Sequence, residues 1–390
     1  MKLHFSNSKV KIIILIFIMC ILIISYATYV TQQLNYKKVS YYAIEPSEKT
    51  QKTLLLWTKF FGNKMWLLPE TDPLSQEYLQ SVNCPVTNCL ITSNRNYLNI
   101  TEFDAVLFHG IESFEKPLDR SDHQLYVFGL LESPPHSRSN LGNYDNFFFN
   151  LTMTYRLNSD IIWSYGYISD IETRKIYAPT ISPNWKVPKL FADNDNNLRK
   201  IVEDKTKLGA WFVSNCNAPS KRHELVNRLQ NYIDIDIYGN CGKFKCPRNS
   251  SECDKLLDKE YKFYFSLENS LCRDYVTEKL YNALKRQIVP VVFGGADYKR
   301  FAPPHSYIDA NDFKSTKELA SYLKYLDRNP EEYMKYFWWK KYYTVSERGF
   351  FCDICLRLNE PVRNEKTQVY RSIESWWYRN SCTTEPNIKF

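Results

Sequence analysis

Residues 263–295 restrict the fold of this chain more than any other stretch. Residues 263–267 alternate aromatic or apolar side chains with small or polar ones, which is typical of a strand. A polar break follows, then Asp274 at a position suited to a helix N-cap and apolar residues at helical spacing over 275–287. The apolar run 288–293 ends at two glycines and fits a buried parallel strand. This order of strand, loop, helix and strand predicts an α/β fold.

The same unit predicts an anion site. A helix N-terminus that follows a strand presents free N–H groups and a partial positive charge, which suit a phosphate. Lys279 can neutralise a phosphate, Glu278 can accept hydrogen bonds from sugar hydroxyls, and Tyr275 can stack on a ring. The alternative, which spacing alone favours, is a surface Glu–Lys pair on an amphipathic helix.

A second unit of this kind comes earlier in the chain. Strands are predicted over 209–215 and 233–238, with a helix over 223–232 between them, so this half is expected to be doubly wound. Lys221 and Arg222 open the helix, where cations oppose the helix dipole, and this indicates a bound anion. An ordinary exposed basic pair is the alternative.

The first half of the chain also reads as an α/β domain, with strands predicted over 54–57, 103–109 and 124–131. Ligands of open α/β sheets bind at the carboxyl ends of the strands, where His109 and Glu132 fall. Glu132, which precedes Ser-Pro-Pro, is the candidate general base, and His109 is a candidate for lining the cleft. The alternatives are a solvated loop carboxylate and a core histidine.

The N-terminus carries an unbroken apolar run over 12–24, which with the next six residues nearly reaches the roughly 20 residues that a bilayer needs. Lysines precede it, so the N-terminus is expected in the cytosol and the rest of the chain in a lumen. We expect a cytoplasmic tail over 1–11, an uncleaved anchor over 12–30 and a stem over 31–52. The alternative is a cleaved signal peptide, because 25–27 fits a small-x-Ala site.

Ten cysteines follow this segment, and an even number after an export signal suggests disulfides. Cys352 and Cys355 form a CxxC that could hold a metal, but no second CxxC and no paired histidines accompany it. Three N-glycosylation sequons also suit a lumenal protein, and the aromatic stretch around the second makes its occupancy doubtful. The sequons are at Asn99, Asn150 and Asn249.

Other charged motifs are expected to be structural or solvated. Arg156 and Asp160 are predicted to form an internal ion pair, with substrate contact as the alternative. The Asp-x-Asp motifs at 193–195 and 234–236 resemble metal sites, but each is expected to be solvated. The net charge of +8 suits an anionic substrate such as a sugar nucleotide and is not clustered enough to argue for nucleic acid.

Three groups of residues resemble one enzyme family. They are ENS at 268–270, DYVTEKL at 274–280 and VPVV with a glycine at 289–294. The block ESP at 132–134, FNLTMTYR at 149–156, SDI at 159–161 and YG at 165–166 is also similar, except that Asn158 stands where an Asp is frequent. This signature resembles the α1,3-fucosyltransferases, which are inverting, GDP-fucose-dependent enzymes. The resemblance covers residues 54–356 and is strongest in the second half.

The resemblance implies a GT-B architecture, in which two Rossmann-like domains face a cleft. It implies an acceptor-binding domain over 53–190, a GDP-fucose-binding domain over 191–348 and a C-terminal segment over 349–390 that packs back on the first domain. Cys84 and Cys89 match the cysteines to which the C-terminal CxxC, Cys352 and Cys355, is tied.

The resemblance also implies roles for the site residues. Glu132 matches the catalytic base, and Arg222, or its neighbour Lys221, matches the residue that binds the diphosphate. The nucleotide sugar contacts Asn269, Tyr275 and Glu278, and Lys279 meets the phosphates.

The implied enzyme is a Golgi type II membrane protein that needs no metal and transfers fucose to the 3-hydroxyl of a GlcNAc in a glycoprotein N-glycan or oligosaccharide. Both the N-glycan core and an antenna remain open as the acceptor. The alternatives are a retaining or metal-dependent glycosyltransferase and a non-catalytic glycan-binding or GDP-sugar-binding protein.

Overall fold

The computed structural model describes residues 16, 18–25, 42–43, 51–137, 141, 147–187, 195–247, 251–347, 349–360 and 366–389. The predicted tail, half of the predicted anchor and most of the predicted stem therefore lie outside the described residues. None of the helices in the described part of the chain has the length and apolar character to span a bilayer.

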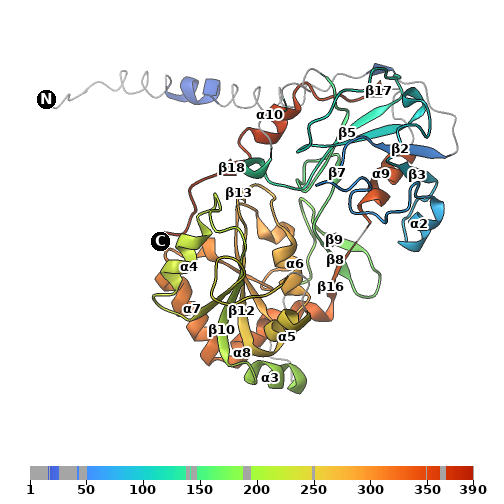
Figure 1. Cartoon of the computed structure of the whole chain (residues 1–390). Coiled ribbons are helices and arrows are strands. Elements are labelled where there is room, and N and C mark those ends of the chain that lie inside the picture. Colours follow the sequence, from blue (N-terminus) through green and yellow to red (C-terminus); the bar gives the residue numbers. More distant parts are fainter. Residues whose placement is uncertain are drawn as a thin grey trace.

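The second domain is built on a parallel sheet of five strands in the order β11-β10-β12-β14-β15 (Figure 1). The strands are β10 (Lys207–Phe212), β11 (Ile235–Tyr238), β12 (Tyr261–Leu267), β14 (Val289–Phe293) and β15 (Ile308–Asp309). Successive side chains point to opposite faces, so each face has its own core. Helices α4 (Arg222–Leu229) and α7 (Thr316–Arg328) cover one face, and α5 (Ser251–Glu260) and α6 (Glu278–Leu284) cover the other.

The first domain has a parallel sheet of six strands in the order β3-β2-β4-β5-β6-β7 (Figure 1). These are β2 (Lys52–Leu56), β3 (Cys89–Thr92), β4 (Ala105–His109), β5 (Leu125–Leu130), β6 (Leu151–Thr154) and β7 (Ile161–Ile162), and helix α2 (Gln76–Ser81) lies beside β3. The strands predicted around residues 54, 105 and 127 are all present. The predicted α/β class with two parallel sheets is therefore confirmed.

Smaller elements connect the two domains. Strands β8 (Tyr167–Asp170), β9 (Ile176–Ala178) and β16 (Tyr343–Ser346) form an antiparallel sheet. In the sequence, β8 and β9 lie at the end of the first domain and β16 lies at the end of the second. Strand β13 (Leu271–Cys272) pairs with β18 (Cys382–Thr383), and β1 (Tyr42–Ala43) with β17 (Lys366–Thr367). Further helices in the described residues are α3 (Asn196–Glu203), α8 (Pro330–Met334), α9 (Phe350–Asn359) and α10 (Ile373–Tyr378), and residues 18–25 are also helical.

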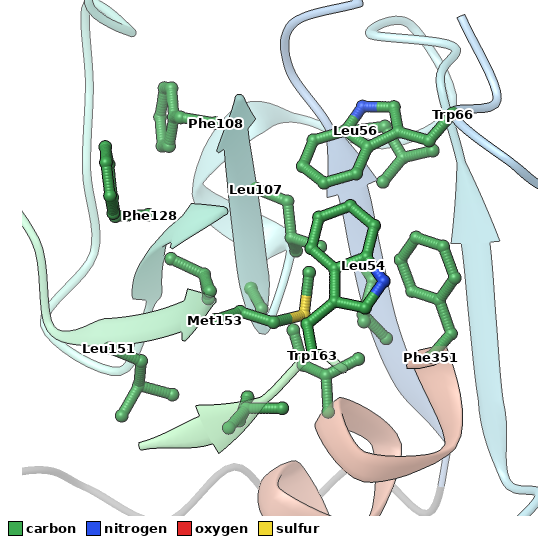
Figure 2. Close-up of a cluster of buried hydrophobic side chains, with 14 of the residues drawn as sticks. Leu54, Leu56, Trp66, Leu107, Phe108, Phe128, Leu151, Met153, Trp163 and Phe351 are labelled. Carbon is green, nitrogen blue, oxygen red and sulfur yellow. The ribbon is translucent and has the colours of Figure 1, made fainter. Parts of the chain in front are cut away.

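The C-terminal segment returns to the first domain after the second domain is complete. In Figure 2, Phe351 of α9 points into the same cluster as Leu54, Trp66 and Trp163. Disulfides join α9 to β3 and to the segment before it: Cys352 is linked to Cys84, which precedes β3, and Cys355 to Cys89, the first residue of β3. The C-terminal CxxC is thus tied to Cys84 and Cys89, as the resemblance implied. The other pairs, which the sequence left open, are Cys216–Cys241, Cys246–Cys253 and Cys272–Cys382.

The helix predicted over 275–287 starts later than expected. Helix α6 begins at Glu278 rather than at Tyr275, and its N-cap is Thr277. Asp274 has a left-handed φ of 62° and accepts a hydrogen bond from the backbone N–H of Leu157, so it joins the two domains instead of capping a helix. Elsewhere in this domain, α8 is followed directly by a 3-10 helix over Lys335–Lys341.

Two of the three sequons differ in their exposure to solvent. Asn99 is exposed, whereas Asn150 is 2% exposed. The Asn150 side chain donates to the backbone carbonyl of Gln368 and accepts from the backbone N–H of Tyr126. Asn249 lies outside the described residues.

We therefore expect glycosylation at Asn99 and not at Asn150. Asn99→Gln should remove one glycan from the protein expressed in eukaryotic cells, because the Asn99 side chain is exposed to the modifying enzyme. Asn150→Gln should leave the glycan mass unchanged and lower the thermal midpoint, because its hydrogen bonds hold the strand that precedes the base. Intact mass before and after glycosidase treatment checks both results, and a glycan on Asn150 of the folded protein would contradict them.

Candidate active site

Three loops meet at the carboxyl ends of the two sheets. The base loop, 131–137, follows β5 and carries Glu132. The strand-end loop, 267–270, follows β12, and the arginine loop, 214–222, follows β10. Ligands of open α/β sheets bind at this edge of the strands.

Glu132 is half-buried in the base loop and lines a cavity of about 430 Å³. The Tyr165 hydroxyl donates to the backbone carbonyl of Leu131 at 2.8 Å and fixes the residue before it. Burial raises the pKa of the Glu132 carboxyl; Lys279 opposes this increase, whereas Glu278 and Glu268 add to it. A carboxylate with a raised pKa is a stronger base, so Glu132 is suited to accept a proton.

The cavity beside Glu132 is mostly aromatic and apolar. Aromatic rings offer flat surfaces on which the C–H faces of a sugar can pack, and Glu132 stands at their edge. The other lining residues are Phe60, Phe61, Leu67, Leu131, Trp163, Ser164, Tyr165, Gly166, Tyr167 and Glu347. Sequence reasoning missed this set because its members come from separate segments of the chain.

The strand-end loop and the start of α6 form a compact ionic cluster. Glu268 is 1% exposed and accepts hydrogen bonds from the backbone N–H of Thr277 at 2.8 Å and from its hydroxyl at 3.0 Å. Lys279 lies 3.2 Å from Glu268 and 3.1 Å from Glu278. Burial opposes the charge of Lys279, but Glu268 and Glu278 outweigh burial and raise its pKa. Lys279 is therefore a permanent cation at the helix N-terminus.

The arginine loop supplies a second cation. Arg222 is 4% exposed and donates to the backbone carbonyls of Leu267 at 2.8 Å and of Asn215 at 3.1 Å. Lys221 has a left-handed φ of 58°, and its ammonium lies 4.0 Å from the exposed Glu385. Of these two neighbours, Arg222 is directed towards the strand ends and Lys221 away from them.

Serine contacts hold the three loops together. Ser133 and Ser270 share a hydrogen bond of 2.8 Å between the domains. The backbone N–H of Ser220 donates to the backbone carbonyl of Asn269 at 3.0 Å, and the Ser220 hydroxyl donates to the backbone carbonyl of Glu268 at 2.7 Å. The base and the two cations are thus positioned by one connected network.

Tyr275 is not in the first turn of α6 but between the domains. Its ring is 2% exposed, and its centroid lies 4.9 Å from that of Tyr155 and 6.4 Å from that of Tyr165. His109 is fully buried behind Phe60, with ring centroids 4.5 Å apart, and burial lowers its pKa to about 4. His109 therefore forms the layer behind the cavity and does not line it.

The predicted ion pair between Arg156 and Asp160 is wrong. Arg156 is directed to the C-terminal segment, where its guanidinium lies 4.2 Å from the ring centroid of Trp376. Asp160 instead accepts hydrogen bonds from Thr152 and from the hydroxyl of Tyr370. Both residues hold the C-terminal segment on the first domain, so each is structural, but through different partners from the one that spacing suggested.

The residues that could have formed metal sites make other contacts in the structure. Asp236 accepts a hydrogen bond from the Tyr261 hydroxyl at 2.6 Å and lies 3.6 Å from Lys207. Residues 193–194 of the first Asp-x-Asp lie outside the described residues. Cys216, His223 and Cys241 come close enough to share a metal, but the two cysteines form a disulfide and their sulfurs are not free to bind one.

Both halves of the chain match models of one family. The model for the N-terminal region of the fucosyltransferases matches residues 49–166, and the model for the C-terminal region of glycosyltransferase family 10 (fucosyltransferase) matches residues 202–376. The chain belongs to glycosyltransferase family 10, the fucosyltransferases. The family that the sequence motifs indicated is thereby confirmed, and the matched ranges contain all three loops of the site.

Curated family members align over most of the chain. Alpha-(1,3)-fucosyltransferase C of Drosophila melanogaster is 45% identical over 87% of this chain and 81% of its own length. Glycoprotein 3-alpha-L-fucosyltransferase A of the same organism is 34% identical over 92% of this chain and 67% of its own length. A solved alpha1,3-fucosyltransferase with GDP-fucose is 17% identical and covers 75% of this chain and 83% of that chain, with a TM-score of 0.45.

Proposed function

We propose that this family 10 protein is an α1,3-fucosyltransferase that transfers L-fucose from GDP-fucose to the 3-hydroxyl of a GlcNAc in a glycan, with inversion. One observation carries the proposal. A carboxylate with a raised pKa, Glu132, lies within electrostatic reach of a half-buried lysine, Lys279, at the junction of two parallel sheets. The first group suits proton removal from an acceptor, and the second suits a diphosphate leaving group.

The transfer is a single displacement at the anomeric carbon of fucose. The acceptor oxygen forms a bond to that carbon as the bond to the β-phosphate oxygen breaks. Glu132 takes the proton of the acceptor hydroxyl, and GDP leaves with the electron pair of the broken bond. Lys279, Arg222 and the N-terminus of α6 stabilise the charge that develops on the diphosphate. Attack from the face opposite the phosphate inverts the anomeric configuration.

The cavity beside Glu132 is the proposed acceptor site. Its rings and its volume of about 430 Å³ suit a mono- or disaccharide, and the apolar rim formed by Phe61 and Leu67 leaves room for a longer glycan. The five disulfides fit an oxidising compartment, and we propose the Golgi lumen, with an anchor within residues 12–30.

The test uses full-length protein purified in detergent. It is incubated with GDP-fucose and EDTA, with either a GlcNAc-terminated N-glycopeptide or a LacNAc oligosaccharide as acceptor. We expect a mass increase of one fucose on an acceptor and an α1,3 linkage in the product. Binding of GDP without transfer to either acceptor would instead favour a GDP-sugar-binding protein, and loss of transfer on chelation would favour a metal-dependent enzyme.

The rate of transfer is expected to fall as the pH drops through the pKa of Glu132, because only the ionised carboxylate accepts a proton. Burial raises this pKa above its ordinary value of 4.5. The base is therefore fully active above the raised pKa and is lost below it. The profile of kcat/KM measured from about pH 4 to pH 8 should show an acidic limb with its midpoint above the ordinary value of a glutamate. A flat profile would contradict the assignment.

A further inference from the structure

We propose that His136 is a donor-site residue, whose imidazole Nε2–H donates a hydrogen bond to a phosphate oxygen of bound GDP-fucose. The first domain would then contribute both the base and part of the diphosphate site. This inference rests on the proposed function and extends it to a residue that neither the spacing nor the family signature singled out.

The base loop places His136 on the side of the donor site. It lies four residues after Glu132, in the 3-10 helix Pro134–His136, and its backbone N–H donates to the carbonyl of Ser133 at 2.9 Å. Ser133 is fully buried, and its hydroxyl bonds that of Ser270 at 2.8 Å. The turn that carries the histidine is therefore fixed against the strand-end loop.

Each of the three joined loops contains a buried polar atom without a hydrogen-bond partner among the described residues. In the described part of the chain, the buried side-chain atoms without a hydrogen-bond partner include one in each of the three joined loops: His136 Nε2, Arg222 Nε and Asn269 Oδ1. Such atoms are uncommon in folded proteins because each carries a desolvation cost. Their occurrence in three connected loops indicates a polar ligand. Arg222 Nε is a donor, and His136 Nε2 is a donor in the tautomer that carries its proton there, so both suit phosphate oxygens.

The charges around His136 favour an anion there. Burial lowers the pKa of His136, and the positive charges of Arg222 and Lys279 lower it further. Both cations therefore lie near enough to repel a proton from the ring. A neutral imidazole still donates from one nitrogen. A bound diphosphate would supply negative charge beside the two cations. Its oxygens would also accept the hydrogen bond that the imidazole N–H donates.

A matched pair of substitutions separates a phosphate contact from a packing role. Gln and Met are similar in length and volume, but only Gln keeps an N–H donor near the place of Nε2. His136→Gln should therefore retain the contact and His136→Met should lose it. His123→Met is the control, because His123 precedes β5 at the end of the strand opposite to the base loop.

The experiment measures binding of GDP and of guanosine to the full chain by calorimetry and by competition. We expect His136→Met to bind GDP roughly ten- to a hundredfold more weakly, since a hydrogen bond to a charged group is lost, and to bind guanosine within about twofold of wild type. His136→Gln should bind GDP within about threefold of wild type, and His123→Met should be unchanged.

Two outcomes would overturn the inference. One is that His136→Met binds GDP as tightly as wild type. The other is that guanosine loses as much affinity as GDP, which would mean a packing defect and not a phosphate contact. Failure of the proposed function is distinguishable from both, because the wild-type chain would then either bind no GDP or bind GDP without transferring fucose to either acceptor.

Discussion

Glu132→Gln is expected to lower kcat for fucose transfer by roughly 10²- to 10⁴-fold, the range typical of losing a general base. The amide is close to the carboxylate in shape but cannot accept the proton of the acceptor hydroxyl. GDP affinity should change little, because Glu132 lies in the base loop and the main phosphate ligands, Lys279 and Arg222, lie outside it. Initial rates at saturating GDP-fucose and a GDP titration measure the two quantities.

Glu347→Gln is the matched control for this substitution. Glu347 lines the same cavity, but its side chain is 80% exposed and lies 2.6 Å from Lys285. Its neutralisation should leave kcat within a few-fold of wild type, because this carboxylate is exposed to solvent and its charge is screened. If Glu132→Gln retains more than about a tenth of the wild-type rate, or if Glu347→Gln causes the larger loss, Glu132 is not the base.

The second domain was the more predictable one because its elements follow local patterns. The run 263–267 alternates, and 289–293 is apolar with glycines after it, so periodicity alone identifies β12 and β14. Glu132 follows a strand, and Arg222 opens the helix that comes after a strand. Both positions could be predicted as site positions because ligands of open α/β sheets bind at the carboxyl ends of the strands. These residues meet because parallel strands bring their carboxyl ends to one side.

What the sequence could not predict depends on contacts between distant segments. Asp274 sits where a helix cap belongs, yet its left-handed backbone turns it to Leu157 in the other domain. The four-residue spacing of Arg156 and Asp160 suggested an ion pair, but the returning C-terminal segment supplies better partners, Trp376 and Tyr370. The aromatic cavity likewise gathers residues that no periodicity connects. His136 follows the ESP motif by two residues, but only the folded arrangement of the loops brings it near Arg222 and Lys279.

Lys279→Met is expected to impair donor binding and folding together. The ammonium is one of two cations at the proposed diphosphate site, so affinity for GDP should fall by at least roughly tenfold, as loss of a hydrogen bond to a charged group implies. Lys279 also neutralises Glu268, which is 1% exposed. Leaving a buried charge without its partner costs about 3 kcal/mol, so the thermal midpoint should drop by several degrees.

The double substitution Lys279→Met with Glu268→Gln separates these two effects. The amide introduced by Glu268→Gln would be uncharged and would still accept from the Thr277 backbone N–H through its oxygen, so most of the lost stability should return. Affinity for GDP should stay low, because the cation that meets the phosphate is still missing. Thermal unfolding and GDP titration of the single and double variants complete the cycle. Recovery of GDP binding along with stability would show that Lys279 serves only to hold Glu268 and the start of α6, and the phosphate role would pass to Arg222 and the helix N-terminus.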